Sequence, residues 1–249
     1  FVVADVEVRR QRIRKGLDAA TRMVPGARWR EDEELVETVT QLTEWASLSS
    51  VVLGGFEPEY LTLPEEVLVT VMRDHQKYFA VEDAAGKLAP HFLTVLNTEA
   101  DAAGQGVIRH GNERVLRARF NDARFFWEFD QRVPLVERVK LLEKMPFQPA
   151  LGSYAAKTER VHALAKRLTV LVASRGATVD AEAVEGAALL AKTDLTTELV
   201  KEFTELQGVV GGLYARTQGL KAAVCDAIYD QYLPASATDA LPRTAEGAL

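Results

Sequence analysis

Apolar residues recur at three- and four-residue spacing through most of this chain, which is the period of amphipathic helices. The first such stretch begins at Asp5, a residue type that caps helices, and Pro25-Gly26 ends it. A second helix is predicted over about 31–45, and the Ser- and Gly-containing stretch 47–55 breaks it. A third is predicted to begin at Pro64, because proline is favoured in the first turn of a helix.

The pattern then changes to short β-prone segments. Residues 77–81 and 91–96 are rich in aromatic and β-branched side chains, and a turn-like stretch separates them. We therefore predict a β-hairpin near 77–96. An arginine-rich helix is predicted to follow at about 112–130, and a shorter helix at 134–145.

The remainder of the chain carries only helical patterns, over 154–174, 180–200 and 206–232. We predict an α+β fold that is predominantly α-helical, with a domain boundary near residue 150. An α+β domain would occupy 1–150, and an all-α domain would occupy 151–249.

Composition limits the class of protein. The chain has 249 residues, 47% of them hydrophobic, which is enough for one large or two modest domains. The longest apolar runs are far shorter than the roughly 20 residues that span a bilayer, so no membrane segment is predicted. Cys225 is the single cysteine, which excludes an internal disulfide, and we expect a buried thiol in a cytoplasmic protein. The net charge is −6, so any nucleic-acid contact must come from local basic patches.

Arginines are concentrated in and just before the predicted helix 112–130. They are Arg109, Arg114, Arg117, Arg119 and Arg124. At about 100° per residue, Arg114, Arg117 and Arg124 fall within an arc of about 80°, which we call the arginine stripe. Guanidinium is permanently charged and can bind two phosphate oxygens, so the stripe suits contacts to a nucleic-acid backbone. The alternative is a structural role, in which the arginines pair with Glu113, Asp122, Glu128 and Asp130.

His75 and Lys77 stand where a helix is predicted to give way to the first strand of the hairpin. That placement would allow both side chains to face a ligand. In the alternative, His75 and Gln76 make structural hydrogen bonds near the hairpin. Tyr78 and Phe79 are predicted to be core residues rather than stacking platforms.

Several short strings occur in a fixed order along the chain. They are HQKYF at 75–79, GNERVLRAR at 111–119, DARFF at 122–126, FQ at 147–148 and LG at 151–152. Further strings flank them: LTEW at 42–45, GGF at 54–56, LTLP at 61–64, KTDL at 192–195 and EFTELQG at 202–208. In order and spacing the series resembles the β subunit of bacterial glycyl-tRNA synthetase, over essentially the whole chain. The segment 46–52 departs from the family by being longer.

The resemblance implies a part of an enzyme that joins glycine to its tRNA. In that family the catalytic site belongs to a separate α subunit, through which the α2β2 holoenzyme uses ATP and Mg²⁺. We therefore expect an internal fragment that is inactive alone, has no catalytic residues and binds no cofactor. Its expected partners are the α subunit and glycine tRNA, with no DNA and no membrane. The candidate tRNA-binding residues are Arg114, Arg117, Arg124, Arg119, Lys77 and His75.

The resemblance also implies that the all-α half is a truncated, degenerate relative of the HD phosphohydrolase fold. Lys157 stands where that fold has a metal-binding histidine, and Thr193-Asp194 stand where it has the His-Asp pair. A lysine ammonium repels a cation, so we expect no metal and no phosphohydrolysis. Two alternatives remain open: a degenerate HD-type metal phosphohydrolase or nucleotide-sensing module, and a helical interaction scaffold without a nucleic-acid role.

Overall fold

The computed structural model describes residues 2–46, 50–98 and 100–249, so part of the segment 46–52 lies outside the described residues. The chain divides into two compact units, Phe1–Arg124 and Phe125–Leu249. The division falls inside the long helix α4 (Ala102–Asp130), whereas the sequence placed a boundary near residue 150. Residues after Arg124 belong with the later helices because Trp127 packs on Tyr214, with ring centroids 4.7 Å apart.

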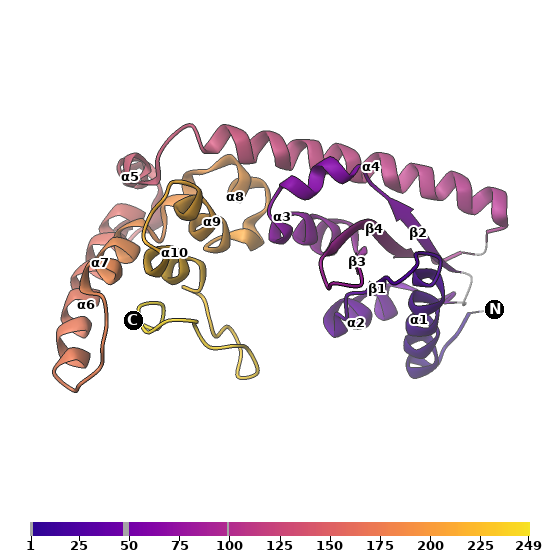
Figure 1. The fold of residues 1–249 in the computed structure, drawn as a ribbon, viewed down its shortest axis with the longest axis horizontal. Coiled ribbons are helices and arrows are strands. Elements are labelled where there is room, and N and C mark those ends of the chain that lie inside the picture. The colour runs from indigo at the N-terminus through magenta and orange to yellow at the C-terminus, as the bar shows by residue number, and fades with distance from the viewer. Residues whose placement is uncertain (1, 47–49, 99) are drawn as a thin grey trace. The chain divides into compact units, whose positions relative to one another are not determined.

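The amino-terminal unit contains a four-stranded antiparallel sheet (Figure 1). Its strands, in the order β1-β3-β4-β2, are Arg28–Trp29, Phe79–Glu82, Leu88–Val95 and Val51–Gly55. The hairpin predicted near 77–96 is β3 and β4, in which Phe79 pairs with Leu93. Strand β2 lies in a stretch that the sequence marked only as a break, because its two glycines hide the strand pattern. Gly54 is required there, since an added Cβ would lie 2.3 Å from Cζ of Phe92.

Helices cover this sheet. They are α1 (Val6–Thr21), α2 (Glu33–Leu42), α3 (Glu65–Thr70), a π-helical turn η3 (Val71–His75) and a 3-10 turn η2 (Pro58–Thr62). The carboxylate of Asp5 accepts a hydrogen bond from the Val8 amide, which confirms the predicted cap of α1. Ile13, Leu17 and Val36 are fully buried against strand residues of the same core. Helices α1 and α2 therefore place their apolar stripes on the sheet.

The carboxy-terminal unit is mainly helical. It contains α5 (Leu135–Arg138), η4 (Val139–Lys144), α6 (Tyr154–Ala173), α7 (Ala181–Leu190), η5 (Thr193–Thr196), α8 (Glu198–Glu202), η6 (Thr204–Leu206), α9 (Val209–Thr217) and α10 (Ala222–Tyr229). Two predicted helices are interrupted, the one at 180–200 by η5 and the one at 206–232 by a turn at Gly219, whose φ is +74°.

The prediction that the chain is all-α from residue 151 was wrong, because a small two-stranded sheet includes residues 152–153. Strand β5 (Pro146–Gln148) pairs with β6 (Gly152–Ser153). A strand of two residues is too short to show an alternating pattern, and Ser153 also caps α6 through the Ala156 amide. The chain is thus mostly helical with a small antiparallel sheet. In its described residues, no helix has the length and apolar character needed to cross a membrane.

Candidate functional site

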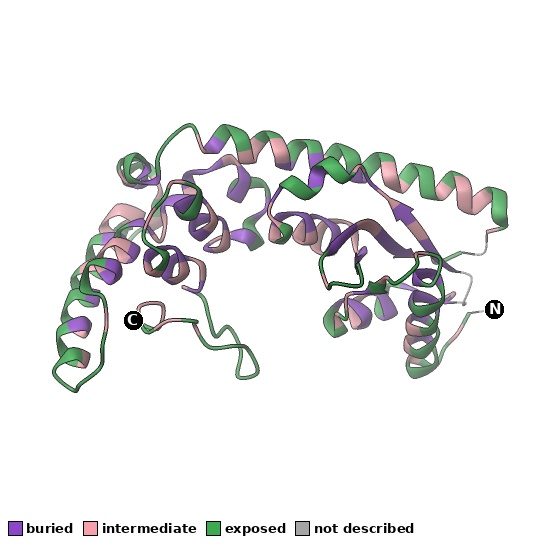
Figure 2. Cartoon of the chain, in the orientation of Figure 1, coloured by how far each residue is buried: buried purple, intermediate pink, exposed green. Residues whose placement is uncertain are grey.

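The arginine stripe lies on the exposed face of α4 (Figure 2). Leu116, Phe120 and Ala123 occupy the opposite face and are fully buried, so the rotational setting of the helix is fixed by its core contacts. Arg114 and Arg117 are exposed, and Arg124 is half-buried. Arg114 and Arg117 therefore present their guanidinium groups to solvent.

Two of these arginines pair with acidic residues on the segment around η2. Nη2 of Arg117 lies 2.7 Å from Oε1 of Glu57, and Nη1 of Arg124 lies 3.0 Å from Oε1 of Glu59. Arg124 also stacks over the ring of Tyr60, 5.0 Å from its centroid. The structural alternative named carboxylates within the helix as partners, and it was wrong on this point for Arg117 and Arg124. Their partners are more than fifty residues away in sequence, beyond the reach of a helical-spacing argument.

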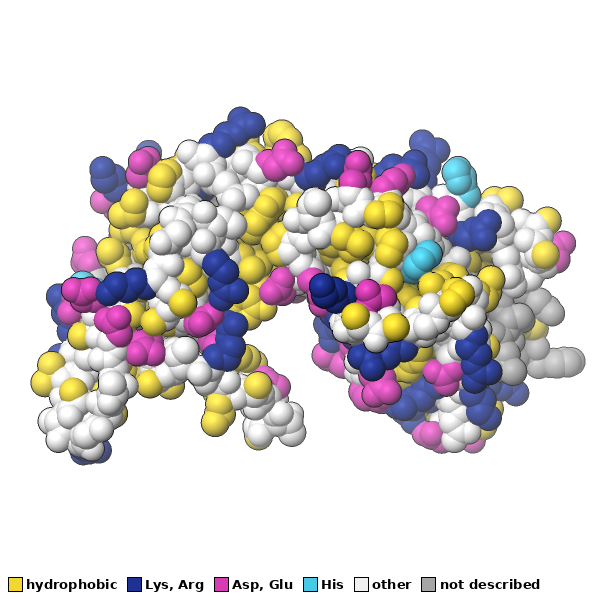
Figure 3. Space-filling view, viewed as in Figure 1, with side chains coloured by type: hydrophobic (Ala, Val, Ile, Leu, Met, Phe, Trp, Pro, Cys, Tyr) yellow, Lys and Arg dark blue, Asp and Glu magenta, His cyan; other side chains and the backbone are white. Residues whose placement is uncertain are grey.

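The other two candidates on α4 differ in their surroundings. Arg119 is half-buried and is engaged with neighbouring groups. Arg114 makes no ion pair with any residue that the structure describes, and its side chain points to solvent at an exposed position. Basic and acidic side chains alternate along the part of the surface that α4 forms in Figure 3. The surface is therefore of mixed charge, and Arg114 is one of its uncompensated cations.

His75 is the last residue of η3, and Lys77 lies in the short connection between η3 and β3. Both are half-buried, and Lys77 has a φ of 59°, an uncommon conformation for a non-glycine residue. Its ammonium donates to the carbonyl of Asp74 at 2.8 Å. Tyr78 and Phe79 are buried, which confirms them as core residues, and Tyr78 stacks on Phe92. The ammonium of Lys77 is thus bound to the end of the preceding helix, which makes Lys77 a poorer candidate for tRNA binding than the arginine stripe.

In the carboxy-terminal unit, Asp194 is fully buried on η5. Its Oδ2 accepts a hydrogen bond of 2.6 Å from the amide of Gly208, the N-cap of α9, and Thr193 donates to the carbonyl of Leu190. An added Cβ on Gly211 would lie 3.1 Å from that Oδ2, so a glycine is needed beside the carboxylate. Burial raises the pKa of Asp194 to about 6. The surviving aspartate of the predicted HD pair therefore holds the start of a helix.

Lys157, the third HD position, lies on α6 and lines a cavity of about 250 Å³ together with Lys192. Burial lowers the pKa of Lys192 to about 8; the charge of Asp194 opposes this shift and that of Lys157 adds to it. The structure thus brings the predicted position Lys157 close to the segment that carries Thr193 and Asp194. Lys192 stands next to that pair and was not among the residues predicted for the site. Within the described residues, no group of three histidine, cysteine or acidic side chains could hold a metal ion.

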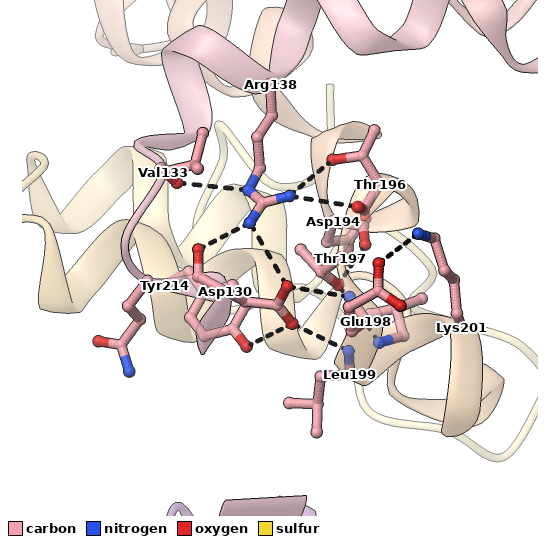
Figure 4. Close-up of polar contacts among 12 residues, drawn as sticks. Asp130, Val133, Arg138, Asp194, Thr196, Thr197, Glu198, Leu199, Lys201 and Tyr214 are labelled. Atoms are coloured by element: carbon pink, nitrogen blue, oxygen red, sulfur yellow. Dashed lines mark hydrogen bonds and ion pairs between the residues drawn. The ribbon is translucent and has the colours of Figure 1, made fainter. Parts of the chain in front are cut away.

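A buried polar network fixes the same unit and was not predicted (Figure 4). The carboxylate of Asp130, at the end of α4, accepts hydrogen bonds of 2.9 Å from the amides of Glu198 and Leu199 and so caps α8. Arg138 lies 3.4 Å from the same carboxylate and donates to the carbonyl and hydroxyl of Thr196. The hydroxyl of Tyr214 donates to Asp130 at 3.3 Å. Such contacts join residues far apart in sequence, so no local pattern signals them.

Two remaining candidates are structural. Cys225 is buried as predicted, and burial raises the pKa of its thiol, which makes it a poor nucleophile. His162, the only histidine on α6, lies 3.6 Å from Glu185, which also pairs with Lys166 at 2.8 Å. His162 therefore belongs to a surface charge cluster.

The described residues thus present a helix face of mixed charge and a cavity that two lysines line. A family model described as glycyl-tRNA synthetase beta subunit matches residues 1–249, and the chain belongs to that family. Among its relatives, the glycine–tRNA ligase beta subunit of Acidobacterium capsulatum is 65% identical over 248 residues, which are 100% of this chain and 35% of that protein. Those of Myxococcus xanthus and Bacillus subtilis are 46% and 41% identical, each over 100% of this chain and 34% and 35% of their own lengths. The chain thus spans about a third of the relatives it matches.

Proposed function

We propose that this chain is a non-catalytic part of a glycine–tRNA ligase β subunit that binds tRNA through the arginine stripe and supports assembly with an α subunit. The observation that carries the proposal is the exposed guanidinium face of α4 in a chain that the family model matches throughout. The name "beta subunit" of the relatives supports the existence of a partner subunit. We place the protein in the cytoplasm, and ATP and Mg²⁺ at the α subunit rather than here.

The ion pairs of the arginine stripe are weak enough for an RNA phosphate to take the place of the carboxylate. The side chain of Arg117 is 51% exposed and that of Glu57 42%, so their ion pair is a surface pair. Such pairs contribute only about 0–1 kcal/mol. An RNA phosphate approaching α4 could therefore replace Glu57 at little cost, while Arg114 has no described ion pair to break. The acidic partners offset part of the positive charge of the face without RNA and oppose loose binding of other polyanions.

We also propose that the carboxy-terminal unit is a degenerate HD-like domain. Support comes from α6 and η5, which bring Lys157 and the segment 192–194 to the same part of the unit. A lysine at the position of a metal ligand disfavours cation binding. The unit is thus proposed to be a scaffold that has lost metal chemistry.

The proposal is tested by titrating labelled glycine tRNA with the full chain at several salt concentrations, with a non-cognate tRNA alongside. Phosphate contacts predict binding to both RNAs that weakens steeply as salt rises, because each contact releases condensed counterions. Absence of binding even at low salt would refute tRNA binding by this chain. It would leave the alternative of a helical interaction scaffold without a nucleic-acid role.

A further inference from the structure

Helix α6 buries a face of small residues and exposes its larger apolar side chains. The residues that it buries are Thr158, Ala165 and Thr169. Leu164 and Leu171, in contrast, are 55% and 46% exposed, and most of α6 is exposed in Figure 2. An ordinary surface helix has the reverse arrangement, since its large apolar side chains face the core. Exposed apolar side chains that gather on one face mark an interaction surface.

The apolar residues outside the buried face follow the spacing of a helix-pairing seam. They are Val161, Leu164, Leu168 and Leu171, which are three, four and three residues apart, and we call them the leucine strip. At about 100° per residue they fall within an arc of about 80°. A helix packs along another helix with this spacing, because each apolar side chain enters a gap between side chains of the facing helix. The leucine strip therefore fits a helix that lies along α6.

Two arginines follow one edge of the leucine strip. Arg160 and Arg167 are exposed and lie within about 40° of that edge. Arg160 donates to the carbonyl of Leu151 at 3.1 Å, and neither arginine forms an ion pair with a carboxylate among the described residues. Lys166, on another side of α6, pairs with Glu185 at 2.8 Å. A partner helix with acidic side chains beside its apolar ones would compensate the two arginines, since such flanking pairs set partner choice in paired helices.

A second copy of this chain matches the leucine strip poorly. If two α6 helices paired antiparallel, the arginine edge of one would lie against the arginine edge of the other, and like charges oppose such pairing. If they paired parallel, each arginine edge would lie beside the opposite edge of the strip, where Ala165 and Val172 offer no carboxylate. The charges therefore favour a different protein whose helix is acidic.

We infer that the leucine strip and its arginine edge are the docking site for an acidic amphipathic helix of the α subunit. Apolar side chains of that helix would pack between Leu164, Leu168 and Leu171, as in other helix-in-groove contacts. Its carboxylates would pair with Arg160 and Arg167. The inference rests on the proposed function for the identity of the partner, because the family name of a beta subunit implies a second kind of subunit. It adds the surface that makes the contact and the chemistry of the partner.

The test measures binding of the purified α subunit to the full chain by titration calorimetry. The variants are Leu164→Glu and Leu171→Glu, each of which places a carboxylate in the leucine strip. Val170→Glu is the matched control, because Val170 is 71% exposed on the same helix and lies about 100° from the edge of the strip. Burying a carboxylate in an apolar contact predicts an affinity lower by about 10- to 100-fold in either strip variant and almost unchanged in the control. Thermal unfolding midpoints should be equal in all of these proteins, since the replaced side chains are exposed.

Charge reversal tests the arginine edge separately. Arg160→Glu and Arg167→Glu should each weaken binding of the α subunit, and more at low salt than at high salt, because salt screens exposed charges. Lys15→Glu, an equal charge change at an exposed position of α1, is the control and should leave the affinity almost unchanged. Equal effects of the three reversals would show only the net charge of the chain and would overturn the acidic character of the partner.

The outcomes separate this inference from the proposed function. Full affinity in both strip variants, or an equal loss in Val170→Glu, would overturn the inference and leave assembly with the α subunit in place. Absence of any α-subunit binding would overturn the inference and the assembly role together, while the tRNA titration would still decide the arginine stripe.

Other occupants of the leucine strip would also overturn the inference, and each has its own signature. Dimers of the chain in sedimentation that Leu164→Glu abolishes would identify a second copy. A loss of tRNA affinity in the strip variants would identify RNA. Protection of the strip from hydrogen exchange without the α subunit, in a β subunit as long as the relatives, would identify further residues of the same polypeptide.

Discussion

The carboxylate of Asp130 has four partners in the interior of the carboxy-terminal unit, and its replacement by asparagine is expected to destabilise that unit strongly. Asparagine replaces one of the two carboxylate oxygens with an amino group that donates, so the amide of Glu198 or that of Leu199 loses its acceptor. It also leaves Arg138, whose side chain is 6% exposed, without its counter-charge. Breaking a buried ion pair by removing one partner costs about 3–5 kcal/mol.

We therefore expect Asp130→Asn to lower the free energy of unfolding by about 3–5 kcal/mol, measured by urea denaturation. Glu182→Gln is the matched control, because it removes a carboxylate that pairs with Lys221 at the surface of the same unit, where the side chains of Glu182 and Lys221 are 84% and 57% exposed. The control should cost less than about 1 kcal/mol. Equal effects of the two substitutions would refute the view that the Asp130 network fixes this unit.

Three further predictions concern other residues. Burial raises the pKa of Asp194 to about 6, from about 3.9 in the unfolded chain. The folded protein therefore binds this proton more tightly than the unfolded chain; the resulting stability is fully present below about pH 4 and is lost as pH rises through 6. The free energy of unfolding of the natural chain should therefore fall between pH 4 and 7 by up to about 3 kcal/mol more than that of Asp194→Asn, as measured by urea denaturation. Parallel pH profiles of the two proteins would contradict this. Gly54→Ala forces a Cβ into the Phe92 ring and should cost at least about 1–3 kcal/mol by the same assay, whereas an unchanged midpoint would show that the strand adapts. Arg117→Ala should change stability by less than about 1 kcal/mol while weakening tRNA binding, and a large loss of stability would favour the structural alternative.

Local sequence signals predicted the regular elements well. The helix cap at Asp5, the hairpin of β3 and β4, and the start of α6 near Tyr154 follow from capping residues, alternation and apolar spacing, which act between near neighbours. Strands β1, β2, β5 and β6 were missed because glycines or extreme shortness remove the pattern. The boundary near residue 150 followed the change from mixed to helical patterns, whereas compactness follows tertiary contacts such as that of Trp127 with Tyr214.

The candidate site shows the same division. The arc of Arg114, Arg117 and Arg124 is a property of one helix, and its exposure could be predicted from the buried stripe opposite. The pairing of Arg117 with Glu57 depends on the chain folding back on α4, and no spacing within the helix encodes it. The cavity likewise needs Lys157 and Lys192 from two separate elements, so Lys192 gains significance only from the fold.

The central claim is that the arginine stripe contacts RNA phosphates, and it is tested most directly by the salt dependence of tRNA binding in a triple variant. The natural chain is compared with Arg114→Ala/Arg117→Ala/Arg124→Ala, and with a control of equal charge change that replaces the exposed Arg22, Arg167 and Arg175. Each lost phosphate contact should reduce the slope of log affinity against log salt by about one, so the stripe variant should lose about two to three. The control should keep the slope of the natural chain. Equal slopes in the stripe variant and the natural chain, with the fold intact, would contradict the claim.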